Sequence, residues 1–192
     1  MARKKEYQED LVLEKAMHTF WANGFENTSL RMLEKDMGIN QFSIYSSFGS
    51  KQRLFIEVLK KYKGFVKEFF IKDLLQSKGH LCDLRRFLLE YGHGIQSGQN
   101  PYGCLMMNTG MEASEKDPDI VFELSSHFDY LKDAFYILFE KIKFNEELPA
   151  QFDSNKYASY LLASIQGLSL FAKFHSQKEV DDYIDTVMGS FI

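Results

Sequence analysis

The amino-acid sequence predicts an all-α protein with a small N-terminal domain and a larger C-terminal domain. The chain of 192 residues has only three prolines and is rich in Leu, Phe, Met and Lys. These residues suit helices, whereas the runs of Val and Thr that are typical of strands are few. Apolar residues recur with helical spacing along most of the chain, and Gly, Asn, Ser and Asp separate the periodic segments. We therefore expect almost no β-strand.

Three short helices are expected within the first 50 residues. Their approximate spans are 7–23, 29–38 and 40–48, the first starting at about Tyr7. Val12, Ala16 and Phe20 give the first helix an apolar stripe, and Gly24 supplies its C-terminal stop. Asn40 is a good N-cap for the third helix. Because an isolated helix of about eight residues is unstable in water, the third helix must pack against the first two.

The rest of the chain has the pattern of a succession of longer helices. The expected spans are about 51–69, 81–97, 103–113, 118–142, 154–175 and 180–192. The first of these begins after the cap Ser50 and has the character of a connector. Asp117 followed by Pro118 marks the start of the clearest long helix, since proline is favoured at the first helical position. We therefore expect two domains, residues 1–50 and residues 51–192.

Charge is distributed unevenly along the chain. Residues 1–64 carry 11 Lys and Arg against 8 Asp and Glu, a net charge of +3, and residues 65–192 carry 12 against 19, a net charge of −7. The overall net charge of −4 would argue against nucleic acid only if it were evenly spread. The basic part holds the three short helices. It begins with Arg3, Lys4 and Lys5, which either add phosphate contacts or form an unstructured basic end.

The third predicted helix has two faces of different chemistry. Ile44 and Phe48 form an apolar face, and Leu33 of the second helix also points inward. The opposite face is uncharged and polar, which suits base edges and phosphates in the major groove of DNA. The residues that can reach bases or phosphates are Gln41, Phe42, Ser43 and Ser46, with Phe42 suited to a thymine methyl group. The segment therefore looks like a DNA-recognition helix.

About residues 10–60 resemble the N-terminal helix-turn-helix signature of the TetR family of bacterial repressors. The matching positions are Ala16, Phe20, Gly24, Phe25, Thr28, Ser29, Leu33, Gly38, Ile39, Ile44, Tyr45, Phe48, Ser50, Lys51 and Leu54. Residue types and spacings agree at many positions at once. Glu34 departs from the small residue usual at its position, and Phe42 is bulkier than in many members, which leaves the base preference open. The rest of the chain agrees in length, helical pattern and two final apolar helices.

The resemblance implies DNA contacts beyond the third helix. It places Tyr45 and Lys51 on phosphate, and it places Thr28 and Ser29 at the N-terminus of the second helix with a hydroxyl and backbone N–H groups. Core packing at the helix junction is the alternative for Tyr45. The main hypothesis is a homodimeric repressor whose third helices each read one half of a palindromic operator in double-stranded DNA.

The resemblance also implies a C-terminal helical domain that binds a small-molecule effector and forms the dimer interface. The candidate pocket residues are Tyr91, Tyr102, Cys104, Met106, Phe128, Tyr160 and Phe171, and ordinary core packing is the alternative for each of them. The aromatic supply favours an apolar or aromatic effector that releases the operator. The interface candidates are Leu161, Ile165, Leu168, Ala172, Val180, Tyr183, Val187 and Phe191, some of which must face the protomer core.

Cys104 suggests a second way of sensing. It lies in Gly103-Cys104-Leu105 at the start of a helix, where N-terminal amides would stabilise a reactive thiolate. Such a thiol would make the protein a repressor that senses electrophiles or oxidants. A buried, inert cysteine is the alternative.

Two other classes of function are less consistent with the residues. For an enzyme, the five histidines are scattered, no glycine-rich phosphate loop or nucleophile elbow occurs, and Glu112 and Glu115 fit a solvated surface better than a metal site. We therefore expect no enzyme, cofactor or metal. A helical adaptor that does not bind DNA would explain the acidic C-terminal part but not the motif around Tyr45. With no apolar run near the roughly 18 residues of a membrane span, we expect a cytoplasmic protein with reduced thiols and no membrane contact.

Overall fold

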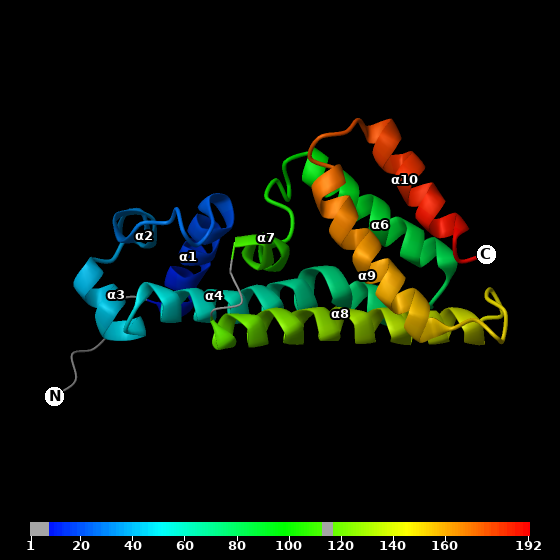
Figure 1. The fold of residues 1–192 in the computed structure, drawn as a ribbon, viewed down its shortest axis with the longest axis horizontal. Coiled ribbons are helices and arrows are strands. Elements are labelled where there is room, and N and C mark those ends of the chain that lie inside the picture. Colours follow the sequence, from blue (N-terminus) through cyan, green and yellow to red (C-terminus); the bar gives the residue numbers. More distant parts are fainter. Residues whose placement is uncertain (1–7, 113–116) are drawn as a thin grey trace. The chain divides into compact units, whose positions relative to one another are not determined.

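The computed structural model describes residues 8–112 and 117–192, and within these residues every regular element is a helix. The predicted all-α fold class is therefore confirmed. The elements are α1 (Glu9–Asn23), α2 (Leu30–Met37), α3 (Gln41–Phe48), α4 (Lys51–Val66), the π-helix η1 (Lys67–Ile71), α5 (Lys72–Gln76), α6 (Leu81–Gln96), α7 (Leu105–Glu112), α8 (Pro118–Phe144), α9 (Ser154–Phe171) and α10 (Gln177–Gly189) (Figure 1).

The chain divides into two compact units that do not follow the order of the sequence. Of the described residues, the first unit contains 8–65, 105–112 and 117–125, and the second contains 66–104 and 126–192. Helix α7 and the beginning of α8 therefore belong with the N-terminal helices. The domain boundary expected after residue 50 stays a prediction, because compactness alone does not define a functional domain.

Side-chain caps fix the ends of the short helices in the first unit. Ser29 Oγ accepts the backbone N–H of Met32 at 3.2 Å at the start of α2. Asn40 Oδ1 accepts the N–H of Ser43 at 2.8 Å at the start of α3. Helix α2 ends at Met37 and is followed by its C-cap Gly38, whose φ of 73° lies in the left-handed region. These caps satisfy backbone groups that a short helix otherwise leaves without intrahelical partners.

An aromatic cluster forms the centre of the first unit. The ring centroid of Phe55 lies 4.8 Å from that of Phe20 and 4.9 Å from that of Phe25. Phe20 and Phe55 are at most 1% exposed, and Leu33 and Ile44 of α2 and α3 are fully buried. Burial of these side chains holds α1, α2, α3 and α4 together, since each fully buried large apolar side chain contributes about 1.5–3 kcal/mol.

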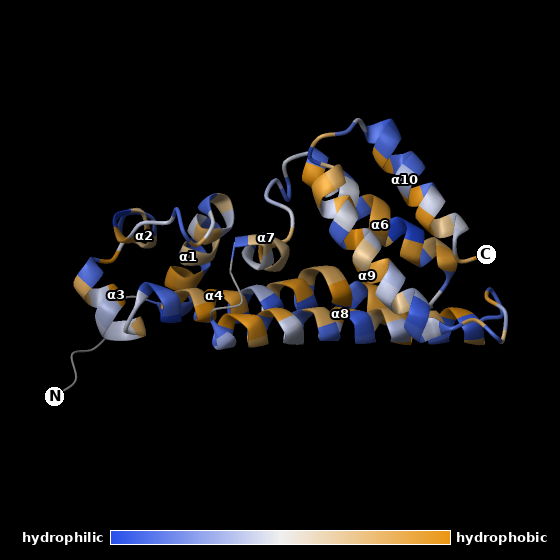
Figure 2. Cartoon of the chain, in the orientation of Figure 1, coloured by the Kyte–Doolittle hydropathy of each residue, from blue (hydrophilic) through white to orange (hydrophobic). Residues whose placement is uncertain are grey.

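In the second unit, α6 packs against α9 and α10. Hydrophilic and hydrophobic residues alternate along α6 and α10, as expected for helices with one buried face (Figure 2). A second aromatic cluster joins side chains of α8, the α8–α9 loop and α9 to Phe191 near the C-terminus. Phe152 stacks on Tyr157 with ring centroids 4.3 Å apart, and Phe139 lies 5.1 Å from Phe191 and 5.3 Å from Phe152.

Three helix ends differ from the sequence-based expectation. Helix α10 begins at Gln177, earlier than predicted, because Ser176 and Glu179 form a capping box at its start. Helix α9 ends at Phe171 rather than near residue 175. The continuous fourth helix expected to residue 69 contains instead the π-helical segment η1 after Val66. No described helix combines the length and the hydropathy that crossing a membrane requires.

Several predictions fall on residues whose structure is not described. The start of the first helix at Tyr7, the basic residues Arg3, Lys4 and Lys5, and the surface position of Glu115 lie outside the described residues. Among the described residues, α1 begins at Glu9.

Gly79 precedes α6 in a turn that a larger residue would disturb. Its φ is 79°, and a Cβ atom at this position would lie 2.5 Å from Cβ of Lys141. The carbonyl oxygen of Gly79 accepts a hydrogen bond from the Asn145 side chain at 2.7 Å. The turn is thus fixed against the end of α8 by close approach as well as by hydrogen bonding.

We expect Gly79→Ala to lower the free energy of unfolding by about 2 kcal/mol, because the left-handed conformation and the close contact both penalise a Cβ atom. Gly94→Ala is the matched control: Gly94 lies within α6, and no atom lies within 4 Å of its Cβ position. The control should be neutral or stabilising by up to about 1 kcal/mol. Urea unfolding followed by circular dichroism measures both, and equal effects would contradict the role given to the turn.

Candidate nucleic-acid interface

Helix α3 presents one face to the core of the first unit and the other to the outside. Ile44 is fully buried and Phe48 is 7% exposed, whereas Phe42 is 79% exposed. This confirms the core positions expected from the helical spacing. Of the residues predicted to contact DNA from this helix, Gln41, Phe42, Tyr45 and Ser46 are exposed, and Ser43 is half-buried. A short, uncharged outer face of this kind suits the major groove.

Tyr45 lies in the last turn of α3, and Lys51 follows shortly after the end of this helix. Tyr45 is 47% exposed, so it is not a core residue, and its phosphate contact stays a prediction. Lys51 is the first residue of α4, and its ammonium nitrogen lies 4.5 Å from the ring centroid of Phe25. That distance is typical of a cation–π interaction. The side chain of Lys51 is thus held over an aromatic face directly after the α3–α4 turn.

The structure separates the two residues predicted at the start of α2. Thr28 is fully buried, and its hydroxyl donates a hydrogen bond of 2.5 Å to the carbonyl oxygen of Gly24. Its side chain therefore stabilises the α1–α2 turn and does not reach the surface. Ser29 is exposed and caps α2. Of this pair, Ser29 is the residue whose side chain a phosphate group can approach.

Sequence reasoning missed a contact between α2 and α3. The side-chain amide of Gln41 donates a hydrogen bond to a carboxylate oxygen of Glu34 at 3.2 Å. Glu34 is the position at which a small residue was expected. The only available signal was the unusual residue type, because spacing alone does not show that two surface side chains on different helices meet. Glu34 therefore influences how Gln41 is presented on the outer face of α3.

The candidate pocket residues do not form one group. Met106 is fully buried in the first unit, and the other six residues lie in the second unit. Tyr91 and Cys104 meet at Ser169, whose side chain hydrogen-bonds to the Tyr91 hydroxyl and accepts the Cys104 backbone N–H at 3.2 Å. Burial raises the pKa of the Tyr91 hydroxyl, so this group stays protonated. Ser169 was not predicted, because a serine on a largely apolar helix carries no signal of its role.

The remaining pocket candidates are dispersed over the second unit. Tyr102 is 38% exposed, Tyr160 is 41% exposed, and Phe128 is half-buried. Phe171 stacks on His175 with ring centroids 3.7 Å apart. Phe171 therefore packs against a neighbouring side chain near the end of α9.

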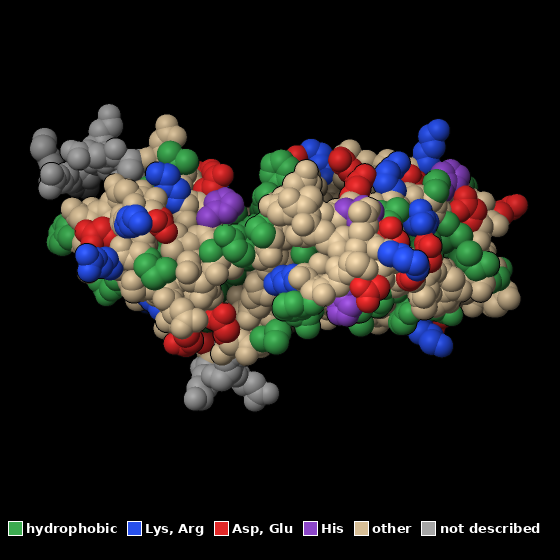
Figure 3. Space-filling view, turned by 90° about the horizontal axis from the view of Figure 1, so that it is seen from above, with side chains coloured by type: hydrophobic (Ala, Val, Ile, Leu, Met, Phe, Trp, Pro, Cys, Tyr) green, Lys and Arg blue, Asp and Glu red, His purple; other side chains and the backbone are tan. Residues whose placement is uncertain are grey.

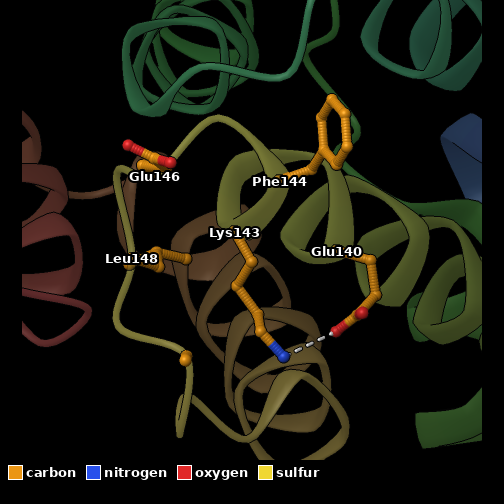
Figure 4. A pocket seen from close by; sticks show the side chains of 6 residues that line it. Glu140, Lys143, Phe144, Glu146 and Leu148 are labelled. Carbon is orange, nitrogen blue, oxygen red and sulfur yellow. Dashed lines mark hydrogen bonds and ion pairs between the residues drawn. The ribbon is translucent and has the colours of Figure 1, made fainter.

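The second unit has several surface hollows, and one of them contains a predicted residue. This hollow, of about 500 Å³, lies between η1, α5 and α6 and includes Tyr91 together with Phe69, Phe70 and Phe87. Another hollow, of about 520 Å³, lies beside the α8–α9 loop. There Lys143 and Glu140 point toward each other and form an ion pair of 3.2 Å (Figure 4). Glu146 lines the same hollow, so its charged lining consists of two carboxylates and one ammonium group.

On the face drawn in Figure 3, Lys and Arg side chains are interspersed with Asp and Glu. Among residues 8–112 and 117–192, no group of three or more His, Cys, Asp or Glu side chains is placed to hold a metal ion. Neither Cys82, which is exposed, nor Cys104, which is half-buried, forms a disulfide with another described residue.

Most residues predicted for a dimer interface pack inside the protomer. Those at most 8% exposed are Leu161, Ile165, Leu168, Ala172, Val180, Val187 and Phe191. Tyr183 is half-buried, and its hydroxyl donates to the backbone carbonyl of Ser164 at 2.9 Å. The physical reason is that the regular apolar stripes of α9 and α10 face each other and α6. The same spacing that marks an interface also marks a core, so the sequence pattern could not separate them.

The comparisons with known proteins agree with this arrangement. Residues 12–58 match the family described as bacterial regulatory proteins of the tetR family, and residues 81–188 match the tetracyclin repressor-like C-terminal domain. The fold and the exposed α3 define a helix-turn-helix DNA-binding transcriptional regulator. The chain belongs to the TetR family, since the C-terminal match alone covers more than half of its residues.

Relatives and solved structures extend over the whole chain. The HTH-type transcriptional regulator YezE of Bacillus subtilis is 29% identical over 98% of both chains. The HTH-type transcriptional repressor ComR of Escherichia coli is 28% identical over 89% of this chain and 82% of its own. A structure of the TetR family regulator CifR, a cysteine mutant complexed with 26-bp operator DNA, has a TM-score of 0.87 at 24% identity and covers 99% of this chain and 100% of its own.

Truncating a side chain on the inner face of α3 should lower stability far more than truncating one on its outer face. Ile44→Ala should lower the free energy of unfolding by about 2–5 kcal/mol, because it opens a cavity in the core. Phe42→Ala should change it by less than about 0.5 kcal/mol, because the ring is largely exposed. Urea unfolding of the two variants provides the comparison. A large loss of stability in Phe42→Ala would mean that this ring belongs to the core and not to the outer face.

Proposed function

We propose that the protein is a cytoplasmic, homodimeric transcriptional repressor in which α3 of each protomer reads one half of a palindromic operator. The observation that carries the proposal is the exposed, uncharged face of α3 opposite the buried Ile44 and Phe48. Its groups for base edges come from Gln41, Phe42, Ser43 and Ser46. Amide, hydroxyl and apolar groups of this kind match the donors, acceptors and thymine methyl groups of the major groove.

Phosphate contacts complete the proposed reading head. Ser29 supplies a hydroxyl and backbone N–H groups at the start of α2. Tyr45 supplies a phenol on the outer side of α3, and Lys51 supplies a cation at the start of α4. Such contacts fix the register of a protein on DNA without reading its sequence. The name of ComR as a repressor and the operator complex of CifR support the same mode of action.

We propose that an apolar or aromatic effector binds the second unit and releases the operator. The hollow that contains Phe69, Phe70, Phe87 and Tyr91 offers aromatic contacts to such a ligand, beside the charged side chains of Asp73, Asp83, Arg86 and Glu90. Release requires that the effector bind more tightly to a form that no longer fits the operator. A thiol-based sensing mechanism is the alternative, and one observation favours it: Cys104 directly precedes α7, where helix N–H groups can stabilise a thiolate.

The proposed dimer uses the outer side of α9. Apolar or small residues follow each other at steps of three and four residues and are exposed along this side: Tyr160, Ala163, Gly167, Leu170 and, just after the helix, Phe174. We call this set the α9 stripe. Its spacing is that of a helix-packing seam, and its small residues at positions 163 and 167 permit close approach. Leu170 at 51% and Phe174 at 77% exposure would gain apolar burial from a second copy.

Specific DNA binding is the test of the main proposal. Fluorescence anisotropy on the intergenic DNA upstream of the gene should show saturable binding at physiological salt. A scrambled duplex should displace the protein roughly a thousandfold less effectively than the specific duplex does. Binding that ignores sequence and disappears as salt rises would reflect weak electrostatics alone. A random-library selection that also yields no preferred sequence would reject the proposal. Where the operator binds, a panel of apolar and aromatic compounds should include one that releases it.

Leu170→Glu should raise the dimer dissociation constant by at least about tenfold, because it places a charge within the α9 stripe. Leu11→Glu is the matched control, since Leu11 of α1 is 49% exposed and lies outside the stripe. Sedimentation velocity over a concentration series measures both variants. A dimer as stable in Leu170→Glu as in the control would place the interface elsewhere.

A further inference from the structure

Phe25 is the meeting point of three segments of the first unit. It lies in the turn between α1 and α2, and its ring packs 4.9 Å from that of Phe55 on α4. Its backbone N–H donates a hydrogen bond of 2.8 Å to a carboxylate oxygen of Glu112, the last residue of α7. The ammonium of Lys51 lies 4.5 Å from the centroid of the same ring. One residue therefore connects the end of α7 to the start of α4.

The approach of Glu112 depends on Gly24. A Cβ atom on Gly24 would lie 2.1 Å from one carboxylate oxygen of Glu112, so a larger residue would force this carboxylate to move. The φ of 79° at Gly24 also belongs to the region that other residues rarely adopt. The carboxylate can therefore reach the Phe25 N–H directly, as a charge-assisted hydrogen bond. The turn between α1 and α2 is thus held by a residue 87 positions further along the chain.

We propose that Glu112 is a positioning residue for DNA binding: by fixing Phe25, it keeps the Lys51 ammonium in the place from which it contacts phosphate. This inference rests on the proposed function. A lysine that is already ordered loses less conformational freedom on binding than a mobile one. The carboxylate itself does not touch DNA. If it acted by its negative charge alone, it would repel DNA and weaken binding. The inference therefore predicts an effect opposite in sign to simple electrostatics.

The test measures operator affinity against salt concentration for Glu112→Ala, Lys51→Met and the double variant. Glu112→Ala should weaken binding by about two- to tenfold per protomer, which corresponds to losing the preordering of one long side chain. Lys51→Met should lower the salt slope by about 0.9 per protomer, or about 1.8 for the proposed dimer. In the double variant, Glu112→Ala should add nothing to the effect of Lys51→Met. A residue with a merely structural role would instead add its full effect.

Two controls separate positioning from charge and from misfolding. Glu26→Ala removes a negative charge from the α1–α2 turn that Glu112 contacts; Glu26 is exposed, and its loss should leave affinity unchanged or slightly higher. Glu112→Gln keeps an oxygen acceptor for the Phe25 N–H and should retain most of the affinity. Circular dichroism melting checks that each variant is folded.

The outcomes distinguish the inference from the proposed function. If the unaltered protein shows no sequence-specific binding, the proposed function fails. If it binds and Lys51→Met has no effect, or Glu112→Ala strengthens binding, or the two changes add in full, the function stands and the positioning role of Glu112 is wrong.

Discussion

The contact on which the first unit depends is the packing of Phe20, Phe25 and Phe55. Helices α2 and α3 have only eight residues each, so neither is stable without tertiary contacts. The three rings join α1, the α1–α2 turn and α4. Helix α1 packs against α2, α2 packs against α3, and α3 buries Ile44 and Phe48 on its inner side. A rigid outer face matters because reading base edges requires side chains that are already in place.

The two units of the fold are interleaved in sequence. The chain passes from the first unit to the second after residue 65, returns at residue 105 and leaves again after residue 125. Helix α7 therefore follows directly on Gly103 and Cys104, which belong to the second unit. A Cβ atom on Gly103 would lie 2.6 Å from the Ser169 hydroxyl, so this point of the chain is tightly held. At its other end, α7 holds the α1–α2 turn through Glu112. Eight helical residues thus separate the neighbourhood of Ser169 from the neighbourhood of Phe25.

The sequence predicts what depends on nearby residues and fails where distant residues meet. Asn40 caps α3 as expected, and Ser29, at the predicted start of the second helix, caps α2, because a cap needs only a side chain and the N–H groups that follow it. The burial of Ile44 and the exposure of Phe42 follow from spacing along one helix. By contrast, the contact of Gln41 with Glu34 joins two helices, and that of Phe25 with Glu112 joins residues far apart in the chain. Thr28 shows a third limit, since its hydroxyl is as suitable for a backbone carbonyl as for phosphate.

The composition of α3 determines how affinity and specificity must be divided. The helix itself, Gln41–Phe48, carries no charged residue, so it offers base contacts but no strong attraction to the phosphate backbone. Phosphate contacts supply a large share of the affinity of most DNA-binding proteins, and here they must come from the flanking residues. Lys51 is the cation nearest in sequence to the end of α3. When few cations serve the recognition helix, the placement of each one matters more. The Phe25 ring next to Lys51, and the Glu112 carboxylate that holds the turn containing Phe25, therefore bear on DNA binding through the position of this one cation.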